Sequence, residues 1–387
     1  MARGQKIKKV VIACDSFKRS LTSAQVAAAA AAGIHDVDSG ILTVELPVAD
    51  GGEGTTDALL AALGGCYIAC EVHDPLMRTI KSHFGVAKIG NALTAIIDMA
   101  SVSGITLLSP KERNPAITTT YGTGEMMLRA WSEGCRRFII GIGGSATNDG
   151  GTGMLSALGV RFLNADGNLL PQGGLALSNL SRIDTSAARK DILGADITVI
   201  SDVTNPLCGP EGASYVYAPQ KGADSDMVAQ LDDALMNYAQ VIEATVGRNV
   251  AEIPGAGAAG GLGAGFLAFS SCRLTRGIDA ILDIIDFNSI VSNADLVITG
   301  EGRIDRQTLF GKVPSGVLAR ATELGVPVVA IAGAVADHDD IAKAPFAGIY
   351  PIANGDLNLE YAMQPAVAAE NVRHTCAQII KRYNLGK

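Results

Sequence analysis

Acidic and amide side chains recur directly after short apolar runs of this sequence, and their types could do chemistry. They are Asp15, Asp50, Glu53, Asn148, Asp149, Asp202, Asn205, Glu301 and Asp305. Any one of them alone is most simply a turn former or a helix N-cap. Five such strand ends in one chain favour a shared site, although carboxylates gathered in one cleft repel one another unless a cation compensates them. Mg²⁺ prefers carboxylate and phosphate oxygens, so the set predicts a magnesium site.

Glycine-rich loops accompany two of these ends. The segments ADGGEG (49–54) and GIGGSATNDGG (141–151) place small residues where helices are expected to begin. Free backbone N–H groups and the helix dipole favour anions at such points. Lys18 and Lys312 stand beside such loops, and lysine side chains suit phosphate oxygens. We therefore expect these segments to bind an anionic substrate.

The five histidines lie outside these clusters, which argues against a histidine-based triad or a zinc site. Phosphoryl transfer fits better, because it needs mainly positioning, charge neutralisation and one carboxylate that takes a hydroxyl proton. An NAD(P)-dependent oxidoreductase acting on a small hydroxy acid is the alternative, because GIGGSA (141–146) matches a dinucleotide-binding fingerprint and Asp166 follows at a suitable distance. A binding module without catalysis is a third interpretation.

The elements that must position these residues follow one plan, in which a continuous run of Val, Ile and Leu precedes a helical pattern. Such runs are typical of parallel strands buried on both faces. We predict an α/β fold with two domains. One is a Rossmann-like, doubly wound parallel sheet built from both chain ends, residues 1–68 and 290–387. The other is an inserted mixed α/β domain, residues 69–289, with a hairpin at Gly90–Asn91.

Composition narrows the class of protein. The 387 residues carry a net charge of −8 and no dense basic stretch, which argues against a nucleic-acid-binding protein. Residues 255–272 lack charge, but their many glycines favour a loop leading into a buried helix over a membrane span. Seven scattered cysteines without a CxxC motif indicate reduced thiols and a cytoplasmic location. The oligomeric state stays open, with a homodimer as one alternative.

Several long motifs occur in a fixed order: DSFKRSLTS, LPVADGGEGT, TTYGTGE, GIGGSATNDGGTGM, DVTNPLCGPEGA, PQKGA, PGAGAAGGLGAG and LVITGEGRIDRQTLFGK. Together, from residue 8 to about residue 335, they resemble the bacterial glycerate kinase family. The resemblance implies ATP-dependent phosphorylation of D-glycerate with Mg²⁺, generally giving 2-phosphoglycerate. It also implies a Rossmann-like domain formed by both chain ends and an inserted domain. The chain departs from the family at Cys14 and Arg19, which replace a proline and a glycine, and at Asp98, where Glu is frequent. We expect Arg19 to point outward.

The combined hypothesis assigns roles to the residues of the cleft. The catalytic residues are Lys18, Asp202 and Asp149, with Asp202 the first choice as base or metal ligand. The substrate- and phosphate-binding residues are Asp15, Ser16, Asp50, Gly51, Gly52, Glu53, Gly143, Gly144, Ser145, Asn148 and Asn205. The nucleotide-binding residues are Glu301, Gly302, Asp305, Thr308 and Lys312. The metal ligands are Asp202 and Glu301.

Overall fold

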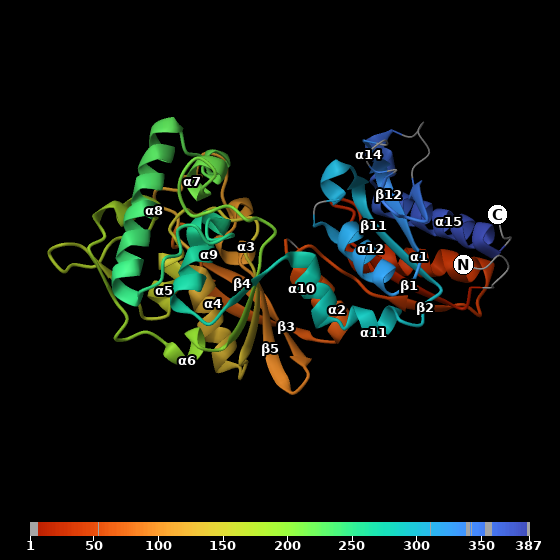
Figure 1. Ribbon diagram of the computed structural model, residues 1–387, viewed down its shortest axis with the longest axis horizontal. Coiled ribbons are helices and arrows are strands. Elements are labelled where there is room, and N and C mark those ends of the chain that lie inside the picture. The colour runs from red at the N-terminus through yellow and green to blue at the C-terminus, as the bar shows by residue number, and fades with distance from the viewer. Residues whose placement is uncertain are drawn as a thin grey trace. The chain divides into compact units, whose positions relative to one another are not determined.

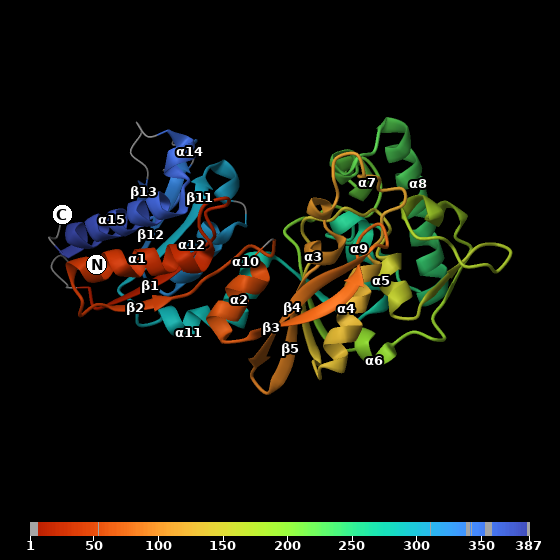
Figure 2. The same cartoon turned by 180° about the vertical axis from the view of Figure 1, so that it is seen from behind.

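The computed structural model describes residues 7–52, 54–309, 311–337, 341, 343–352 and 358–384. The chain divides into two compact units, which Figures 1 and 2 draw from opposite sides. Unit 1 comprises Met1–Asp50, Asp57–Gly64 and Gly277–Lys387, and unit 2 comprises Gly51–Thr56 and Gly65–Arg276. These ranges are near, but not identical to, the predicted domains; the domain boundaries themselves stay a prediction.

Unit 1 is built on a parallel sheet with the order β13-β12-β11-β1-β2. Its strands are β1 (Lys9–Cys14), β2 (Leu42–Glu45), β11 (Leu296–Ile304), β12 (Val328–Val335) and β13 (Gly348–Pro351). Val10 and Ile12 of β1 join one hydrophobic core, and the alternating Val11 and Ala13 are also fully buried. Both faces of the sheet are therefore covered, as continuous apolar runs predict.

The helices of unit 1 include α1 (Ser23–Val37) and α12 (Val313–Glu323), which contact strands of this sheet. The others are α10 (Gly277–Ile284), α11 (Phe287–Val291), α14 (Leu359–Ala362), α15 (Pro365–Asn384) and most of α2 (Thr55–Leu63), with a 3₁₀ turn at Arg306–Leu309. α1 starts in a capping box between Thr22 and Gln25 and lies beside α15 (Figure 1). A Cβ atom on Gly33 would lie 2.0 Å from the Arg373 carbonyl oxygen, so this glycine permits the close approach of α1 and α15.

Unit 2 contains a sheet of mixed orientation with the order β10-β9-β6-β5-β4-β3. Its strands are β3 (Cys66–His73), β4 (Thr79–Ile89), β5 (Ala92–Asp98), β6 (Arg137–Gly141), β9 (Asp196–Ile200) and β10 (Arg273–Thr275); β7 (Arg161–Leu163) and β8 (Arg182–Asp184) form a separate pair. β3, β4 and β5 are antiparallel, and the other neighbours in this sheet are parallel. The predicted hairpin at Gly90–Asn91 is confirmed, because Ile89 pairs with Ala92. The α/β fold class with one parallel and one mixed sheet is thus confirmed.

The helices of unit 2 are α3 (Ala100–Ser103), α4 (Tyr121–Ser132), α5 (Thr152–Ala157), α6 (Lys190–Leu193), α7 (Ala213–Tyr217), α8 (Ser225–Val246) and α9 (Ala258–Phe269), with 3₁₀ turns at Ile105–Leu107, Gly174–Asn179 and Pro219–Lys221. α9 is the predicted buried helix after the glycine-rich loop. Among the described helices, none combines the length and apolarity that crossing a bilayer requires. The seven cysteines are free thiols.

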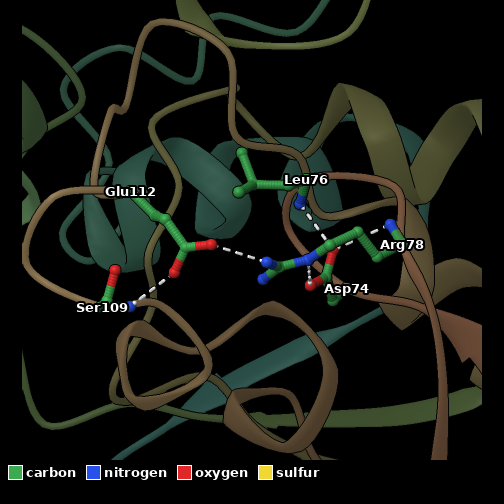
Figure 3. Close-up of polar contacts among 5 residues, drawn as sticks. All are labelled: Asp74, Leu76, Arg78, Ser109 and Glu112. Atoms are coloured by element: carbon green, nitrogen blue, oxygen red, sulfur yellow. Dashed lines mark hydrogen bonds and ion pairs between the residues drawn. The ribbon is translucent and has the colours of Figure 1, made fainter.

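A buried aspartate organises the turn between β3 and β4 (Figure 3). The Asp74 carboxylate accepts hydrogen bonds from the backbone N–H of Leu76 and of Arg78, at 2.8 and 2.9 Å, and from Arg78 Nε at 2.6 Å. Arg78 also pairs with Glu112 at 2.7 Å, and the other oxygen of Glu112 accepts from Ser109 N at 2.9 Å. The bonds from Ser109, followed by the one from Arg78, lower the pKa of Glu112 to about 2.

This turn also supports a distant segment. The carbonyl of Pro75, inside the turn, accepts a hydrogen bond from Thr119 N at 3.0 Å. His73, just before the turn, bonds the Glu125 carboxylate of α4 through its backbone N–H and its ring Nδ1. The turn therefore fixes the backbone that leads into α4.

Candidate active site

A pocket of about 350 Å³ lies at the carboxyl ends of the unit 1 strands, where open parallel sheets bind ligands. Its polar lining includes residues that follow β1 and β2 and residues toward the end of β11. Of the residues predicted from the sequence, the pocket brings together Asp15, Ser16, Lys18, Asp50, Glu301, Gly302 and Lys312. Arg303 adds a cationic side chain that the sequence analysis did not single out.

Asp15 is the most perturbed carboxyl group of this pocket. Asp15 is only 7% exposed, and its Oδ1 accepts a hydrogen bond from Ser16 N at 2.6 Å. Burial first, and the negative charge of Asp50 second, raise the pKa of Asp15 from 3.8 to about 7; Glu301 adds to this, whereas Lys18 opposes it. A bound cation would relieve this repulsion.

Glu301 is held by its neighbours on the 3₁₀ turn and on the loop before α12. One oxygen accepts a hydrogen bond from the hydroxyl of Thr308, which is fully buried, and the other lies 3.4 Å from Lys312 Nζ. Burial raises the pKa of Glu301, and these two partners oppose the shift. Asp305 forms an ion pair of 3.4 Å with Arg303. Thr308 thus orients Glu301 from the interior of unit 1.

Unit 2 holds a second, buried polar cluster around Asp149, which is fully buried. One carboxylate oxygen accepts from Thr120 N at 2.8 Å, from Thr120 Oγ1 at 2.9 Å, from Gly153 N at 3.1 Å and from Thr119 Oγ1 at 3.4 Å, and the other accepts from Gly151 N at 3.2 Å. Burial raises the pKa of Asp149, and the bonds from Thr120 oppose it most. Asp149 therefore joins the backbone before α4 to the start of α5.

Lys221 lies in the same unit and is 2% exposed. Its ammonium group donates to Ser145 Oγ at 2.8 Å and to the Thr147 carbonyl at 2.6 Å. Burial lowers the pKa of Lys221 to about 7, whereas the charge of Asp149 works in the opposite direction. Lys221, Thr119 and Thr120 are not identified as site residues from the sequence. The motifs PQKGA and TTYGTGE contain them, but the sequence does not show that these side chains are buried.

The predicted anion nest has a different local structure from the one expected. The loop after β6 continues to Gly151, and α5 begins only at Thr152. Its first N–H groups already bond to Asp149, Asn148 Nδ2 donates to Ser214 Oγ at 3.0 Å, and Ser145 accepts from Lys221. Gly143 and Gly144 are exposed. The anion-binding role of this loop stays a prediction.

The glycines of the two loops have a packing reason. A Cβ atom on Gly141 would lie 2.8 Å from the Gly51 carbonyl oxygen, which is too close. A Cβ on Gly260 would lie 2.0 Å from the Thr147 carbonyl oxygen. Glycine at these positions lets three loops of unit 2 approach backbone to backbone.

Two further predicted residues, Asp202 and Asn205, lie in the loop after β9. Asp202 is exposed. Asn205 donates to the Glu211 carbonyl at 2.7 Å and accepts from the Tyr217 hydroxyl at 2.6 Å, so its amide holds the loop together. Asp202 and Glu301, the predicted metal ligands, belong to different units. Glu53 lies outside the described residues.

The carboxylates of the unit 1 pocket are the type of ligand that Mg²⁺ prefers, but in the described part of the chain too few lie close together to complete its coordination. Asp15, Asp50 and Glu301 offer hard oxygen donors. Among the described residues, however, no three His, Cys, Asp or Glu side chains gather closely enough to hold a metal ion by themselves. The residues therefore fit a Mg²⁺ ion that keeps water and phosphate oxygens as ligands, as is usual for this ion.

The dinucleotide fingerprint lacks its required context. In that motif a helix begins directly on the glycine-rich turn and its free N–H groups face a pyrophosphate. Here the helix starts after Gly151, and the N–H groups of Gly151 and Gly153 bond to the Asp149 carboxylate. The oxidoreductase alternative is therefore not supported.

Comparisons with known proteins agree on one family. The model of the "Glycerate kinase family" matches residues 10–384. A "Glycerate kinase" of Bacillus subtilis (strain 168) is 44% identical over 98% of this chain and 98% of its own length. A "Glycerate 2-kinase" of Escherichia coli (strain K12) is 44% identical over 85% of this chain and 86% of its own. The crystal structure of a Salmonella typhimurium LT2 protein assigned as glycerate kinase 2 superposes with a TM-score of 0.90 at 42% identity, covering 98% of this chain and 99% of that one. The resemblance seen in the motifs is confirmed: this chain belongs to the glycerate kinase family.

Proposed function

We propose that this protein transfers the γ-phosphoryl group of ATP to D-glycerate and releases 2-phosphoglycerate and ADP. Membership of the family and the names of the relatives support the reaction, and the name of the Escherichia coli relative supports position 2. The observation that carries the proposal is the pocket of unit 1, in which Asp15, Asp50 and Glu301 lie with Lys18 and Lys312. Charged groups of both signs at the carboxyl ends of a parallel sheet suit a metal-bound nucleotide.

We assign the lysines of this pocket to phosphate binding and its carboxylates to metal binding. Lys18 and Lys312 neutralise phosphate oxygens, and Lys18 acts on the group being transferred. One or two of the carboxylates of Asp15, Asp50 and Glu301 would hold Mg²⁺ together with water and phosphate oxygens, and the ion would supply positive charge to the phosphates. Thr308 keeps the Glu301 carboxylate in place by its hydrogen bond.

The proton of the glycerate hydroxyl goes to a carboxylate while that oxygen bonds to phosphorus and the bond from phosphorus to the β-phosphate bridging oxygen breaks. We assign this base to Asp202, because its side chain is exposed whereas that of Asp149 is buried. Asp202→Asn should lower kcat by roughly 10²–10⁴-fold at unchanged thermal stability. Asp166→Asn, at an exposed turn of the same unit, is the control. Full turnover by folded Asp202→Asn would remove Asp202 from this role.

The reaction itself is tested by a phosphorus NMR spectrum of the product formed from ATP and D-glycerate. We expect resonances of ADP and 2-phosphoglycerate to grow together. A 3-phosphoglycerate resonance would contradict the position of transfer. Unchanged ATP would contradict the proposed reaction.

We also propose a cytoplasmic location and leave a homodimer as the alternative to a monomer. The location rests on the free thiols, which are typical of a reducing compartment. Light scattering coupled to size-exclusion chromatography separates a chain of 39.8 kDa from its dimer.

A further inference from the structure

The pocket of unit 1 has a second part that its charged residues do not explain. Ala334 near the end of β12, Ile352 after β13, Ala362 of α14, Met363, and Ala368 of α15 contribute apolar lining. Apolar side chains make no favourable contacts with phosphate, Mg²⁺ or the small polar glycerate molecule. It suits a flat ligand group with apolar faces, and methionine is a side chain that adapts to such groups.

The same pocket contains two unsatisfied polar atoms. Ser20 Oγ and Asn371 Nδ2 are buried and lack a hydrogen-bond partner in the part of the chain that the structure describes. Asn371 lies one helical turn after Ala368, so both project from the same face of α15. A buried donor without an acceptor carries a desolvation cost that a ligand acceptor removes. This part of the pocket therefore combines an apolar surface with two hydrogen-bonding groups. A site that binds an aromatic ring needs both, the first for the faces of the ring and the second for its edge.

We propose that this part of the pocket binds the adenine base of ATP, with Asn371 and Ser20 bonding the edge of the base. This inference rests on the proposed function for the identity of the nucleotide. Asn371 Nδ2 donates to a ring nitrogen, and the Ser20 hydroxyl can both donate to a ring nitrogen and accept from an amino group. The apolar residues cover the faces of the ring, and the triphosphate lies with Lys18, Lys312 and the carboxylates. A pocket of about 350 Å³ is within the range of small-ligand sites.

The decisive experiment compares the binding of ADP with that of inorganic pyrophosphate, which lacks the base, by isothermal titration calorimetry. The variants are Asn371→Leu, which keeps the approximate shape without the donor, and Ser20→Ala. Each should weaken ADP binding roughly 3- to 10-fold, the effect of one neutral hydrogen bond, and leave pyrophosphate binding unchanged. Gln378→Ala, at an exposed position of α15, should change neither. Thermal unfolding checks that every variant is folded.

A kinetic arm separates this inference from the proposed reaction. With wild-type turnover established, Asn371→Leu should raise the KM for ATP by the same factor and leave the KM for glycerate within about twofold. Wild-type turnover together with unchanged ADP affinity in both variants overturns the adenine site and leaves the reaction standing. Weakened ADP affinity in a protein that does not phosphorylate glycerate supports the adenine site and overturns the reaction. Equal weakening of ADP and pyrophosphate also overturns the adenine site.

Discussion

Two buried carboxyl groups, one in each unit, differ in what surrounds them. Asp15 of unit 1 accepts from Ser16 N and faces the negative charges of Asp50 and Glu301. Asp149 of unit 2 accepts hydrogen bonds from two backbone N–H groups near the start of α5 and from both the N–H and the hydroxyl of Thr120. Burial raises the pKa of both, but repulsion adds to it at Asp15 and hydrogen bonds oppose it at Asp149.

We interpret this difference as one of role: Asp15 binds a ligand, whereas Asp149 stabilises the fold. Buried charge is tolerated when donors of the protein satisfy it, as at Asp149. Where like charges face one another, the arrangement costs stability until a cation arrives, as we propose for Asp15. Carboxyl groups whose pKa is raised by neighbouring negative charges, as at Asp15, are typical of functional sites.

The largest effect is expected at Asp149. Asp149→Ala removes the acceptor of several buried N–H and O–H groups, and we expect a loss of about 3–5 kcal/mol in the free energy of unfolding together with loss of turnover. Denaturant unfolding measures it, with exposed Asp166→Ala as control. A change below about 1 kcal/mol would mean that these hydrogen bonds do not hold unit 2 together.

Lys18 should show the opposite pattern. Its side chain is exposed at the pocket, so Lys18→Ala should lower the melting temperature only slightly, through the lost attraction to Asp15, and lower kcat roughly 10²–10³-fold through lost stabilisation of the transferring phosphoryl group. Lys88→Ala, an exposed lysine of β4, is the kinetic control. Turnover equal to that of the control would place Lys18 outside the reaction.

Asp15→Asn should stabilise the protein while abolishing efficient turnover. The folded pKa of about 7 exceeds the ordinary value, so the contribution of Asp15 to stability is complete below pH 3.8 and is lost as the pH rises through 7. The variant should therefore match the wild type near pH 4 and exceed it by about 2–4 kcal/mol at pH 8. Urea unfolding at both pH values measures the gap. A gap that does not grow with pH would contradict the repulsion around Asp15.

Lys221 predicts a pH dependence of its own. The folded pKa of about 7 is below the ordinary value, so the unfolded chain binds the extra proton between pH 7 and about 10.5. Stability attributable to Lys221 thus rises over this window. Relative to Lys221→Met, the wild type should gain about 3 kcal/mol between pH 7 and pH 9.5. Parallel pH profiles of the two proteins would contradict this; Lys88→Met, an exposed site, should follow the wild type.

The smallest effect is expected at Arg19, which has a φ of +66° and is exposed, as the outward orientation predicts. A side chain costs free energy in this left-handed region, and glycine does not. Arg19→Gly should stabilise unit 1 by about 0.5–1 kcal/mol, the strain relieved less the entropy of the unfolded chain. Arg19→Ala keeps the Cβ atom and should therefore resemble the wild type. Equal stability of the Gly and Ala variants would show that the backbone is not strained there.

Much of the unit 1 pocket could be predicted from the sequence, because parallel strands bring their carboxyl ends to one edge. Asp15, Asp50 and Glu301 each follow or end an apolar run, and the pocket contains all three. β2 ends at Glu45, earlier than the apolar run suggests, although the N–H groups of Leu46 and Val48 still bond to the carbonyls of Ile12 and Cys14.

The buried cluster of unit 2 could be predicted only in part. Lys221 is far in sequence from Ser145 and Thr147, and an isolated lysine in a polar stretch indicates a solvated surface residue. Likewise, nothing local shows that Asp149 occupies the N–H groups at the start of α5, which an anion was expected to bind. Sequence periodicity reports which segments are strands and helices, whereas these contacts depend on how the loops meet.

The most direct test of the contrast is a thermal-unfolding titration with Mg²⁺ and ATP together at pH 8. We expect the ligand pair to raise the melting temperature of the wild type clearly more than that of Asp15→Asn, because the pair relieves a repulsion that the variant lacks. An equal rise in both proteins, at equal saturation, would show that the pocket of Asp15 is not the place where the metal-bound nucleotide is held.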